Sequence, residues 1–503
     1  MLNQITVSKM NKLKLPNYQH FFSIFITMLA LMWSGWALKM DQKTDQKKDR
    51  EKYLFTDPPL SPGHPFLLIW NAPTEFCEIH HKLPLDLSHF HIISSTMKRE
   101  TNQTVSLFYI NRFGRFPYYE HGTNKEHNGG LPQLLKVEDH HYDADYFIKK
   151  YIPFNQEGLA VLDFEEWRPL WIRNWGNKRI YRDKSIELVM KRNASLSPAE
   201  TTALAIEEFE VAGKRYFIDS LRIGKKLRPK RLWGYYLFPD CYNYGFNKNF
   251  DKFTGECPDR EKLRNDRLKW LWRECTALYP SLYLELKLNN TEQALWFIRH
   301  RMQETIRVSK LVDESYSIPI HAYIRPVYKN AVNNYMSEED LVKTIGEAAA
   351  LGAASVISWG DMSLVRRPET CTAARDHLRD VMNPYILNVT TATQLCSKAL
   401  CQGRGRCMRK NLTTDVYLHL DSRNYLIERQ NIGGPLTVSG SLSQDDVNEF
   451  DLNFNCMCYS KGPCRSVMLL NKTAPTKSGG AHGPQPLLLM MRLICLMYVV
   501  MWK

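Results

Sequence analysis

The chain has 503 residues, 12% of them aromatic and 24% charged, a composition typical of a globular protein that excludes a disordered one. Its length allows one large domain and a smaller one. Lysine and arginine number 67 against 53 for aspartate and glutamate, a formal net charge of +14, so an acidic partner such as nucleic acid, anionic lipid or an acidic polysaccharide is expected.

The N-terminus predicts export through the secretory pathway. Lysines precede an apolar run at 21–38, and Gly35-Trp36-Ala37 offers a small-x-small cleavage site. Residues 1–37 are therefore predicted to be a signal peptide or, alternatively, an uncleaved anchor. Either would expose the bulk of the chain to extracellular polyanions and not to nucleic acid. Six Asn-x-Ser/Thr sequons agree with export: Asn102, Asn193, Asn289, Asn388, Asn411 and Asn471.

Short apolar strands alternate with helices between Tyr53 and about Tyr385. The expected strands are 66–70, 105–109, 159–163, 232–238, 318–324 and 355–359. The expected helices are 186–190, 198–212, 291–308 and 338–351, the last with a capped start at Ser337. This alternation predicts a parallel α/β fold, most simply a barrel of the TIM type, with its active site at the C-terminal strand ends.

Asp163 and Glu165 follow an apolar run at 158–162. At i and i+2 on a strand, two side chains project to the same face about 7 Å apart, whereas Glu166 points the other way. Two carboxylates in a partly dry cleft cannot both ionise cheaply, so one pKa rises and that group can act as a general acid near neutral pH. The alternative interpretation is an exposed acidic strand end.

Tryptophans favour the catalytic interpretation. Trp167, Trp171 and Trp175 follow the acidic pair at intervals of four, and aromatic surfaces beside carboxylates are common where sugars bind. A basic run at 225–231 predicts a solvated loop or, alternatively, a polyanion contact.

Twelve cysteines in an exported chain predict disulfides and not a metal site, and no metal or cofactor is expected. Cys241 and Cys257 are expected to close a local loop, and Cys77 and Cys371 to tie the beginning of the main domain to its end. The spacing C-x4-C-x5-C and then C-x-C-x5-C in the last quarter resembles an EGF-like module. Its members are Cys396, Cys401, Cys407, Cys456, Cys458 and Cys464.

The C-terminal segment 465–503 predicts a linker and a hydrophobic tail. A Gly/Pro/Ser-rich stretch at 474–486 precedes an apolar run at 487–502, the pattern of a GPI-attachment signal with Ser478-Gly479-Gly480 as the candidate site. Arg492 interrupts the apolar run, so a stop-transfer helix and a simple secreted tail stay open.

Four segments carry a resemblance to a known family: Val161–Pro169, Trp233–Asn243, Ala277–Ser281 and Asn383–Asn388. Together they resemble the animal hyaluronidases, glycoside hydrolase family 56, and among them the sperm-surface type. The likeness runs from about Pro62 to Cys464 and includes the cysteine framework. It implies a distorted (β/α) barrel at 54–385, an EGF-like module at 386–464, and endo-hydrolysis of the β-1,4 bond after N-acetylglucosamine in hyaluronan, with chondroitin as a slower substrate.

The resemblance also implies roles for single residues. Glu165 matches the general acid/base and Asp163 the carboxylate that orients the substrate's acetamido group. The expected substrate-binding residues are Tyr109, Tyr236, Tyr283, Tyr323, Trp359 and Arg301, and Asn388 matches a glycosylated position. Taken singly, each tyrosine is more often a core or rim aromatic, and Arg301 could be a helix-surface charge.

The placement of both carboxylates on one strand face suits neither usual two-carboxylate geometry, in which the groups flank the bond. It does suit attack by the substrate's own acetamide oxygen, with Glu165 as acid and then base and with retention of configuration.

The resemblance predicts a monomer that binds hyaluronan and related glycosaminoglycans. It would be secreted or held at the cell surface by a lipid anchor or hydrophobic tail, as on the sperm plasma or acrosomal membrane. The alternative is a catalytically weak hyaluronan-binding or adhesion protein. Tyr236 is expected to differ in a chondroitin-selective branch.

Three positions depart from the family pattern or framework. Cys275 stands where related sequences carry Ser, and with five disulfides it and Cys495 are left unpaired. A free thiol near the groove could perturb the site or join two chains. Phe164 stands where relatives usually carry Trp, which we expect to be a tolerated aromatic packing change.

Overall fold

The computed structural model describes residues 54–95, 101–431 and 434–466. The predicted signal segment, Asn471, Cys495 and the C-terminal tail lie outside the described residues. Within the described residues, no helix is long and apolar enough to cross a membrane. The described chain belongs to one compact unit that begins at Leu54.

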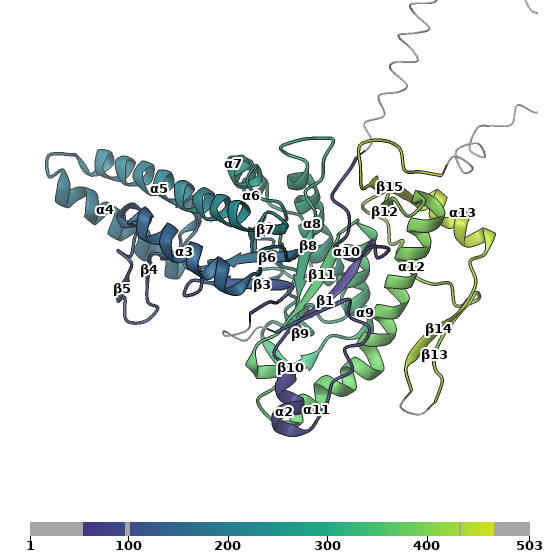
Figure 1. The fold of residues 1–503 in the computed structure, drawn as a ribbon. Coiled ribbons are helices and arrows are strands. Elements are labelled where there is room, and N and C mark those ends of the chain that lie inside the picture. Colours follow the sequence, from purple (N-terminus) through teal and green to yellow (C-terminus); the bar gives the residue numbers. More distant parts are fainter. Residues whose placement is uncertain (1–53, 96–100, 432–433, 467–503) are drawn as a thin grey trace, which may run out of the picture. The chain divides into compact units, whose positions relative to one another are not determined.

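Parallel strands form the centre of this unit (Figure 1). One sheet has the order β2-β1-β11-β8 and another the order β3-β6-β7, and every pairing within these two sheets is parallel. The strands are β1 (Leu67–Asn71), β2 (Ile92–Ser94), β3 (Val105–Tyr109), β6 (Gly158–Asp163), β7 (Arg231–Tyr235), β8 (His321–Ile324) and β11 (Ser355–Trp359). The expected strands are thus present, although 232–238 and 318–324 are shorter than predicted.

The irregular segment 277–283 connects the two sheets. Isolated parallel bridges tie it to Tyr236 after β7 and to Tyr323 in β8. Gly234 in β7 permits the close approach, because a Cβ there would lie 2.2 Å from the backbone oxygen of Ala277. On the other side, Val105 N–H in β3 donates to Ser94 Oγ in β2 at 3.1 Å. The strands therefore follow one another around a distorted barrel in chain order.

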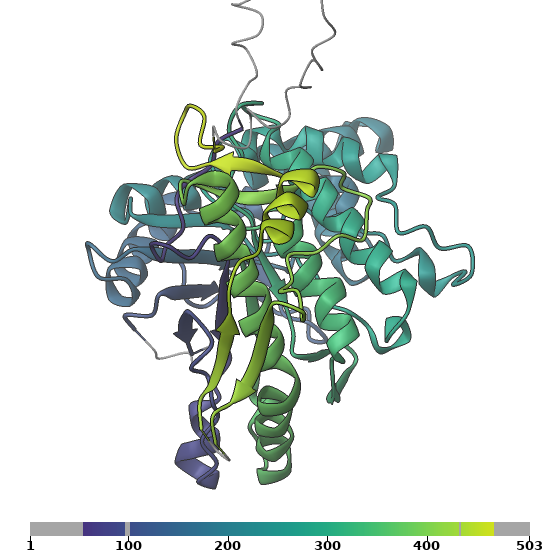
Figure 2. The ribbon, with the colours of Figure 1, turned by 90° about the vertical axis from the view of Figure 1, so that its right-hand side faces the viewer.

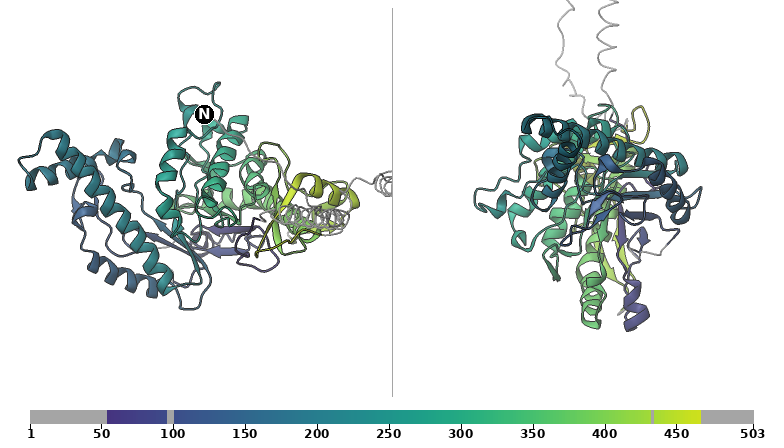
Figure 3. Two further views of the ribbon diagram at one scale, coloured as in Figure 1. Left: turned by 90° about the horizontal axis from the view of Figure 1, so that it is seen from above. Right: turned by 90° about the vertical axis from the view of Figure 1, so that its left-hand side faces the viewer.

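Helices surround the barrel. The longer ones are α3 (Val137–Tyr151), α4 (Arg179–Arg192), α5 (Pro198–Leu227), α8 (Glu292–Ser309), α11 (Pro368–His377) and α12 (Asn383–Cys401). The shorter ones are α2 (Glu75–His81), α6 (Asp259–Arg267), α7 (Lys269–Trp272), α9 (Glu338–Leu341), α10 (Glu347–Ala350) and α13 (Gln444–Asn453). Figure 3 shows the blue-to-teal helices α3, α4 and α5 on the side of the strands away from the yellow C-terminal elements.

Three of the expected helices differ from the prediction. The helix expected at 186–190 is part of the longer α4, which runs from Arg179 to Arg192. The helix expected at 198–212 continues to Leu227, because Tyr216, Phe217 and Leu221 are buried and extend its apolar face. The helix expected at 338–351 starts as predicted, with Ser337 accepting from Asp340 N–H. A π-helical turn at Val342–Gly346 then separates α9 from α10.

Alternation along β6 divides its side chains between two cores. Leu159 and Val161 point into the barrel with residues of β1, β3 and β11. Ala160, Leu162 and Phe164 point outward into the core that contains Phe217 and Leu221 of α5. Phe164 is 1% exposed, and its ring packs 4.9 Å from that of Phe116, so the Trp-to-Phe difference lies in the outer core and not in the barrel interior.

Five disulfides are present among the described residues: Cys77–Cys371, Cys241–Cys257, Cys396–Cys407, Cys401–Cys456 and Cys458–Cys464. The last three staple a small module built on the pair β12 (Gly405–Arg409) and β15 (Phe454–Cys458). A hairpin of β13 (Tyr425–Arg429) and β14 (Leu436–Gly440) extends alongside α12 (Figure 2).

Helix α12 runs without a break through the domain boundary predicted at 385/386. Tyr385 and Val389 belong to the core beside the barrel, whereas Cys396 and Leu400 belong to the core of the disulfide-rich module. One helix thus contributes to both cores, and the boundary stays a prediction.

Minor antiparallel pairs complete the described structure. They are β4 (Tyr118–Tyr119) with β5 (Glu126–His127), and β9 (Val327–Tyr328) with β10 (Ala331–Tyr335).

Two features, a basic run and a free cysteine, differ from the sequence-based interpretation. The basic run at 225–231 is not a solvated loop, because α5 includes Lys225 and Lys226 and because Arg228 and Arg231 are buried against backbone carbonyls. Cys275 is unpaired but buried, and burial raises the pKa of its thiol to about 12. It is a core residue, and the idea that its thiol joins two chains is wrong.

Candidate active site

The main cleft lies at the C-terminal ends of the barrel strands and has a volume of about 630 Å³. Asp163 ends β6, Tyr236 follows β7, Tyr323 lies near the end of β8, and Trp359 ends β11. The remaining residues that line the cleft are Leu107, Glu165, Arg168, Arg173, Trp175, Gly176, Asn177, Lys178, Leu237, Asp240, Tyr242, Tyr244, Ser281, Tyr283, Arg325 and Lys329. Strand ends from several parts of the chain thus meet where a barrel carries its chemistry.

Asp163 continues the inward-facing series of Leu159 and Val161 and is the first polar residue of that series. Its Oδ1 atom is buried and has no hydrogen-bond partner in the described structure. Burial raises the pKa of the Asp163 carboxyl to about 8, and the nearby charges of Glu165 and Glu166 add to the rise. The raised pKa expected for one of the two carboxylates therefore belongs to Asp163.

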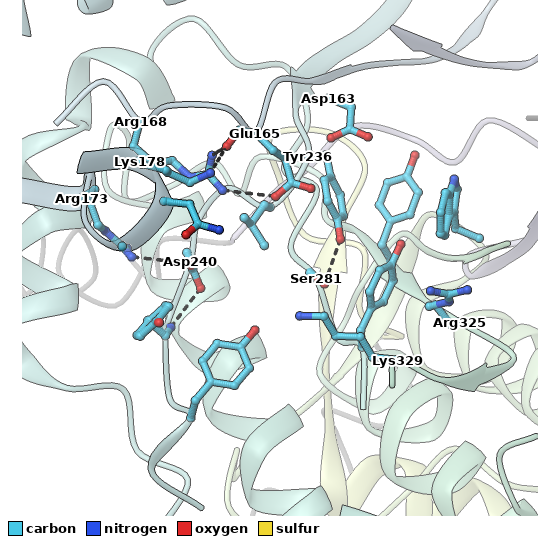
Figure 4. A pocket seen from close by; sticks show the side chains of 18 of the residues that line it. Asp163, Glu165, Arg168, Arg173, Lys178, Tyr236, Asp240, Ser281, Arg325 and Lys329 are labelled. Atoms are coloured by element: carbon cyan, nitrogen blue, oxygen red, sulfur yellow. Dashed lines mark hydrogen bonds and ion pairs between the residues drawn. The ribbon is translucent and has the colours of Figure 1, made fainter. Parts of the chain in front are cut away.

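Glu165 follows the end of β6, and its side chain is 49% exposed. Arg168 Nη2 lies 3.3 Å from Glu165 Oε2, and Arg168 Nη1 donates to the Glu165 carbonyl at 2.8 Å. Lys178 Nζ donates to the same carbonyl, and Glu165 N–H donates to Glu166 Oε2 at 3.1 Å. Figure 4 shows Arg168 and Lys178 beside Glu165. Two cations and one carboxylate thus fix the backbone that carries Glu165.

Four aromatic side chains form a wall of the cleft. The Tyr236 ring lies 5.2 Å from that of Tyr323 and 6.0 Å from that of Tyr283, and Tyr283 stacks on Trp359 at 6.3 Å. Tyr236 OH donates to Ser281 Oγ at 3.3 Å, whereas Tyr323 OH is buried and, within the described residues, has no partner. Four residues predicted to bind substrate are therefore brought together, and one of them holds an unused hydroxyl.

Tyr109 lies beside this wall, directly opposite Asp163 in the register of β3 and β6. Burial, with the charge of Asp163, raises its pKa to about 12, and it is hydrogen bonded to Trp359. Tyr109 is not among the described residues that line the cleft. It lies beside Asp163 and Trp359, which do line it.

Arg301 lies behind the cleft on α8. Its guanidinium is 4% exposed; Nε donates to Asn243 Oδ1 at 2.9 Å and Nη1 donates to the Ser281 carbonyl at 3.0 Å. It also covers the Tyr244 ring at 4.9 Å. The alternative that Arg301 is a helix-surface charge is therefore wrong, and two of its contacts, Ser281 and Tyr244, line the cleft.

Cations around the cleft were missed in the sequence. Arg173 Nη1 contacts Asp240 Oδ2 at 3.4 Å, and Arg325 Nη2 contacts Asp361 Oδ2 at 3.1 Å. Lys329 lies over the Tyr244 ring at 5.8 Å. Figure 4 shows Arg173 with Asp240 on one side of the cleft and Arg325 on the other. The sequence indicated such cations through its net positive charge, which does not show which lysines and arginines lie at the cleft.

The three spaced tryptophans lie in different environments. Trp167 and Trp171 are buried in the core that packs on α5, whereas Trp175 is 47% exposed and lines the cleft. The aromatic surface inferred from their spacing thus comes from one of them. Among the described residues, no group of three or more His, Cys, Asp or Glu side chains is placed to hold a metal ion.

A parallel barrel whose mouth holds two carboxylates of different environment and an aromatic wall is the architecture of a glycoside hydrolase. The comparison with known families agrees. The family model described as "Hyaluronidase" matches residues 55–467, so this chain belongs to the hyaluronidase family and is a glycosidase of family 56.

Relatives and solved structures support the same family. The chain is 44% identical over 415 residues to "Hyaluronidase PH-20" of Homo sapiens, which covers 82% of this chain and 80% of that protein. It is 45% identical over 411 residues to "Hyaluronidase-5" of Mus musculus, with 82% and 77% covered. The crystal structure of bee venom hyaluronidase in complex with hyaluronic acid tetramer matches with a TM-score of 0.55 and 25% identity, over 64% of this chain and 98% of that one. The predicted α/β barrel is thereby confirmed.

Proposed function

We propose that this chain hydrolyses the β-1,4 bond after N-acetylglucosamine in hyaluronan, and chondroitin more slowly. The observation that carries the proposal is the unequal pair at the end of β6. Asp163 is partly buried, its pKa is raised, and its Oδ1 has no hydrogen-bond partner among the described residues, whereas the Glu165 side chain is half exposed beside Arg168. The bee venom protein was solved with a hyaluronic acid tetramer, which supports the same substrate class here.

The proposed mechanism uses the acetamido group of the substrate as nucleophile. The acetamide oxygen bonds to the anomeric carbon while the glycosidic C–O bond breaks and Glu165 protonates the leaving oxygen. A water molecule then attacks the anomeric carbon of the cyclic intermediate, Glu165 takes its proton, and the acetamide is released with configuration retained. Neighbouring carboxylates on one strand end favour this route over two that flank the bond about 5 Å apart.

Asp163 has a separate task in this proposal. It is to accept a hydrogen bond from the acetamide N–H and so aim the acetamide oxygen. In the free site, burial raises the pKa of Asp163 to about 8. Because an N–H donor favours the ionised carboxylate, bound substrate should lower this pKa.

Two variants test the roles of the pair. Glu165→Gln keeps the shape but cannot donate a proton, so kcat for reducing-end release from hyaluronan is expected to fall about 10²- to 10⁴-fold. Asp163→Asn is expected to lose activity as well, because an amide cannot orient the acetamide N–H as a carboxylate does. Equal activity in wild type and Glu165→Gln would overturn the mechanism. Binding without cleavage at any pH between 4 and 8 would leave a hyaluronan-binding protein instead.

Substrate preference is tested separately. Turnover of defined hyaluronan and chondroitin oligosaccharides, read by mass spectrometry across pH, is expected to be faster for hyaluronan. Comparable rates would contradict the preference, and Tyr236 would then be the first residue to substitute.

Export and surface attachment are part of the proposal. Five disulfides indicate an oxidising compartment. Asn102, Asn193, Asn289 and Asn411 are exposed, and Asn388 is half-buried with its Oδ1 accepting from Leu420 N–H. Release of the protein from cells by a phosphatidylinositol-specific phospholipase is the expected result for a lipid anchor. Retention after that treatment would favour a membrane-spanning tail.

A further inference from the structure

A second pocket adjoins the catalytic cleft and has a volume of about 530 Å³. It is built almost entirely from the loop that the Cys241–Cys257 disulfide closes. The residues that line it are Tyr242, Asn243, Tyr244, Gly245, Asn247, Lys248, Asn249, Lys252, Phe253, Thr254, Gly255, Glu256, Pro258 and Arg260. Tyr242 and Tyr244 line both hollows, so the second pocket continues the first.

The floor of this pocket is held in place by buried contacts. Asn243 is 2% exposed; its Nδ2 donates to the Gly255 carbonyl at 2.6 Å and to the Phe297 carbonyl at 3.1 Å. Its Oδ1 accepts from Arg301 Nε. Gly255 has a φ of +79°, and a Cβ there would lie 2.5 Å from the backbone of Trp296. The loop therefore presents a preformed surface.

Cations exceed anions around the second pocket. Lys248 and Lys252 are exposed and line it, and neither makes an ion pair with a described residue. Lys329 lies over the Tyr244 ring, where the two hollows join. Glu256 is the carboxylate that lines the pocket, and Arg260 contacts Glu261 Oε1 at 3.6 Å. The free ammonium groups are available to an anionic ligand.

We propose that this pocket binds the continuation of the polysaccharide beyond the catalytic cleft, with Lys248 and Lys252 contacting carboxylates of the next disaccharide units. The inference rests on the proposed function, because it takes the ligand to be a polymer with one carboxylate in each disaccharide. Tyr242 and Tyr244 supply the aromatic surface between the hollows, and Lys329 supplies the charge at their junction.

The two lysines act on binding and not on chemistry. Exposed ion pairs are weak, so the loss of both contacts is expected to raise KM for long hyaluronan about twofold to thirtyfold at low salt. Because the contacts are exposed, this difference should shrink as ionic strength rises. The value of kcat should not change, since neither lysine lies in the catalytic cleft.

The experiment compares two double variants with the same change in charge. Lys248→Gln with Lys252→Gln removes the proposed contacts. Lys125→Gln with Lys398→Gln is the control, because these lysines are exposed and lie in neither hollow. Initial rates on high-molecular-mass hyaluronan are measured at low and high salt, and thermal unfolding confirms that both variants fold.

The outcomes separate this inference from the proposed function. A salt-sensitive rise of KM in the first variant alone supports it. Equal KM in wild type and first variant, or an equal rise in the control, overturns it while hyaluronan cleavage stands. If the wild-type protein cleaves no hyaluronan at any pH between 4 and 8, the proposed function is wrong and this inference is wrong with it.

Discussion

Two carboxylates of this molecule have buried oxygens in opposite circumstances. Asp163 lines the cleft at the mouth of the barrel, and its buried Oδ1 has no hydrogen-bond partner among the described residues. Glu347, on α10, is fully buried and bound by two arginines. The Asp163 carboxyl thus has a buried oxygen without a hydrogen-bond partner among the described residues, whereas both oxygens of Glu347 accept hydrogen bonds.

Glu347 joins the barrel helices to the disulfide-rich module. Its Oε1 accepts from Arg299 Nε of α8 and from Arg409 Nη2 of β12, both at 2.6 Å, and its Oε2 accepts from Arg409 Nη1 at 3.0 Å. Arg299 also contacts Asp415 Oδ1 at 2.7 Å. Figure 1 shows α10 between α8 and β12. Each charge in this cluster thus has an opposite charge beside it, and both oxygens of Glu347 accept hydrogen bonds, although Arg409 Nε has no hydrogen-bond partner among the described residues.

The difference separates structure from function. A buried charge that is fully paired is tolerated because its partners replace water. A buried polar atom left open is costly, and its persistence at the end of a barrel strand indicates that a ligand supplies the missing partner. Because Asp163 and Tyr323 also line the cleft, we propose that substrate supplies their missing partners, whereas Glu347 holds two parts of the chain together.

The largest expected effect comes from breaking the filled cluster. Glu347→Gln leaves Arg409 buried without a countercharge and leaves Arg299 paired with the exposed Asp415, a change expected to cost about 3 to 5 kcal/mol. For a chain of this size the thermal midpoint should fall by about 5 °C. Differential scanning fluorimetry at neutral pH measures it.

Glu449→Gln is the matched control for that variant, because Glu449 is exposed on α13. The cluster would not be a structural link if Glu347→Gln unfolded at the wild-type temperature. Activity below the lowered midpoint is expected to be retained, since Glu347 lies outside the cleft.

Substitution of Asp163 should have the opposite effect on the free energy of unfolding, an increase and not a loss. The pKa of Asp163 is raised from 3.8 to about 8, so between these values the folded state binds more protons than the unfolded state and stability falls as pH rises. Asp163→Asn removes this loss. Between pH 5.5 and 7.5 its advantage in free energy of unfolding over wild type should grow by about 2 to 3 kcal/mol, at about 1.36 kcal/mol per pH unit.

Thermal unfolding of both proteins at several pH values checks this expectation, with the exposed Asp251→Asn as control. The expected result is an inactive variant that is more stable than wild type at pH 7.5. A difference in free energy of unfolding that stays constant across this pH range would mean that the pKa of Asp163 is not raised in the folded protein.

The fold could be predicted where the local pattern sets the structure. The strand 159–163 was predicted because its apolar run must be buried on both faces, and Ser337 marked the start of α9. Helix α12 was not predicted, because it packs on two cores at once and its pattern follows neither of them alone.

The site could be predicted in part. The acidic pair and four aromatic residues lie together in the cleft, as the family resemblance implies. Arg168, Lys178 and Lys329 were missed, because which lysines and arginines face a cleft depends on loop conformations that no periodicity encodes. The acidic pair also differs from the expectation that both carboxylates project from one face of a strand, because β6 ends at Asp163 and leaves Glu165 more exposed.

Lys178 offers the smallest and most specific test of how the open site is organised. Its Nζ donates to the Glu165 carbonyl, which Arg168 also contacts, so Lys178→Gln removes one of two cations that hold Glu165. A lost hydrogen bond of about 0.5 to 1.5 kcal/mol predicts a twofold to tenfold lower kcat with KM unchanged. Lys178→Arg should restore kcat, because it keeps the charge and a donor. A raised KM with normal kcat in Lys178→Gln would instead place Lys178 against the substrate.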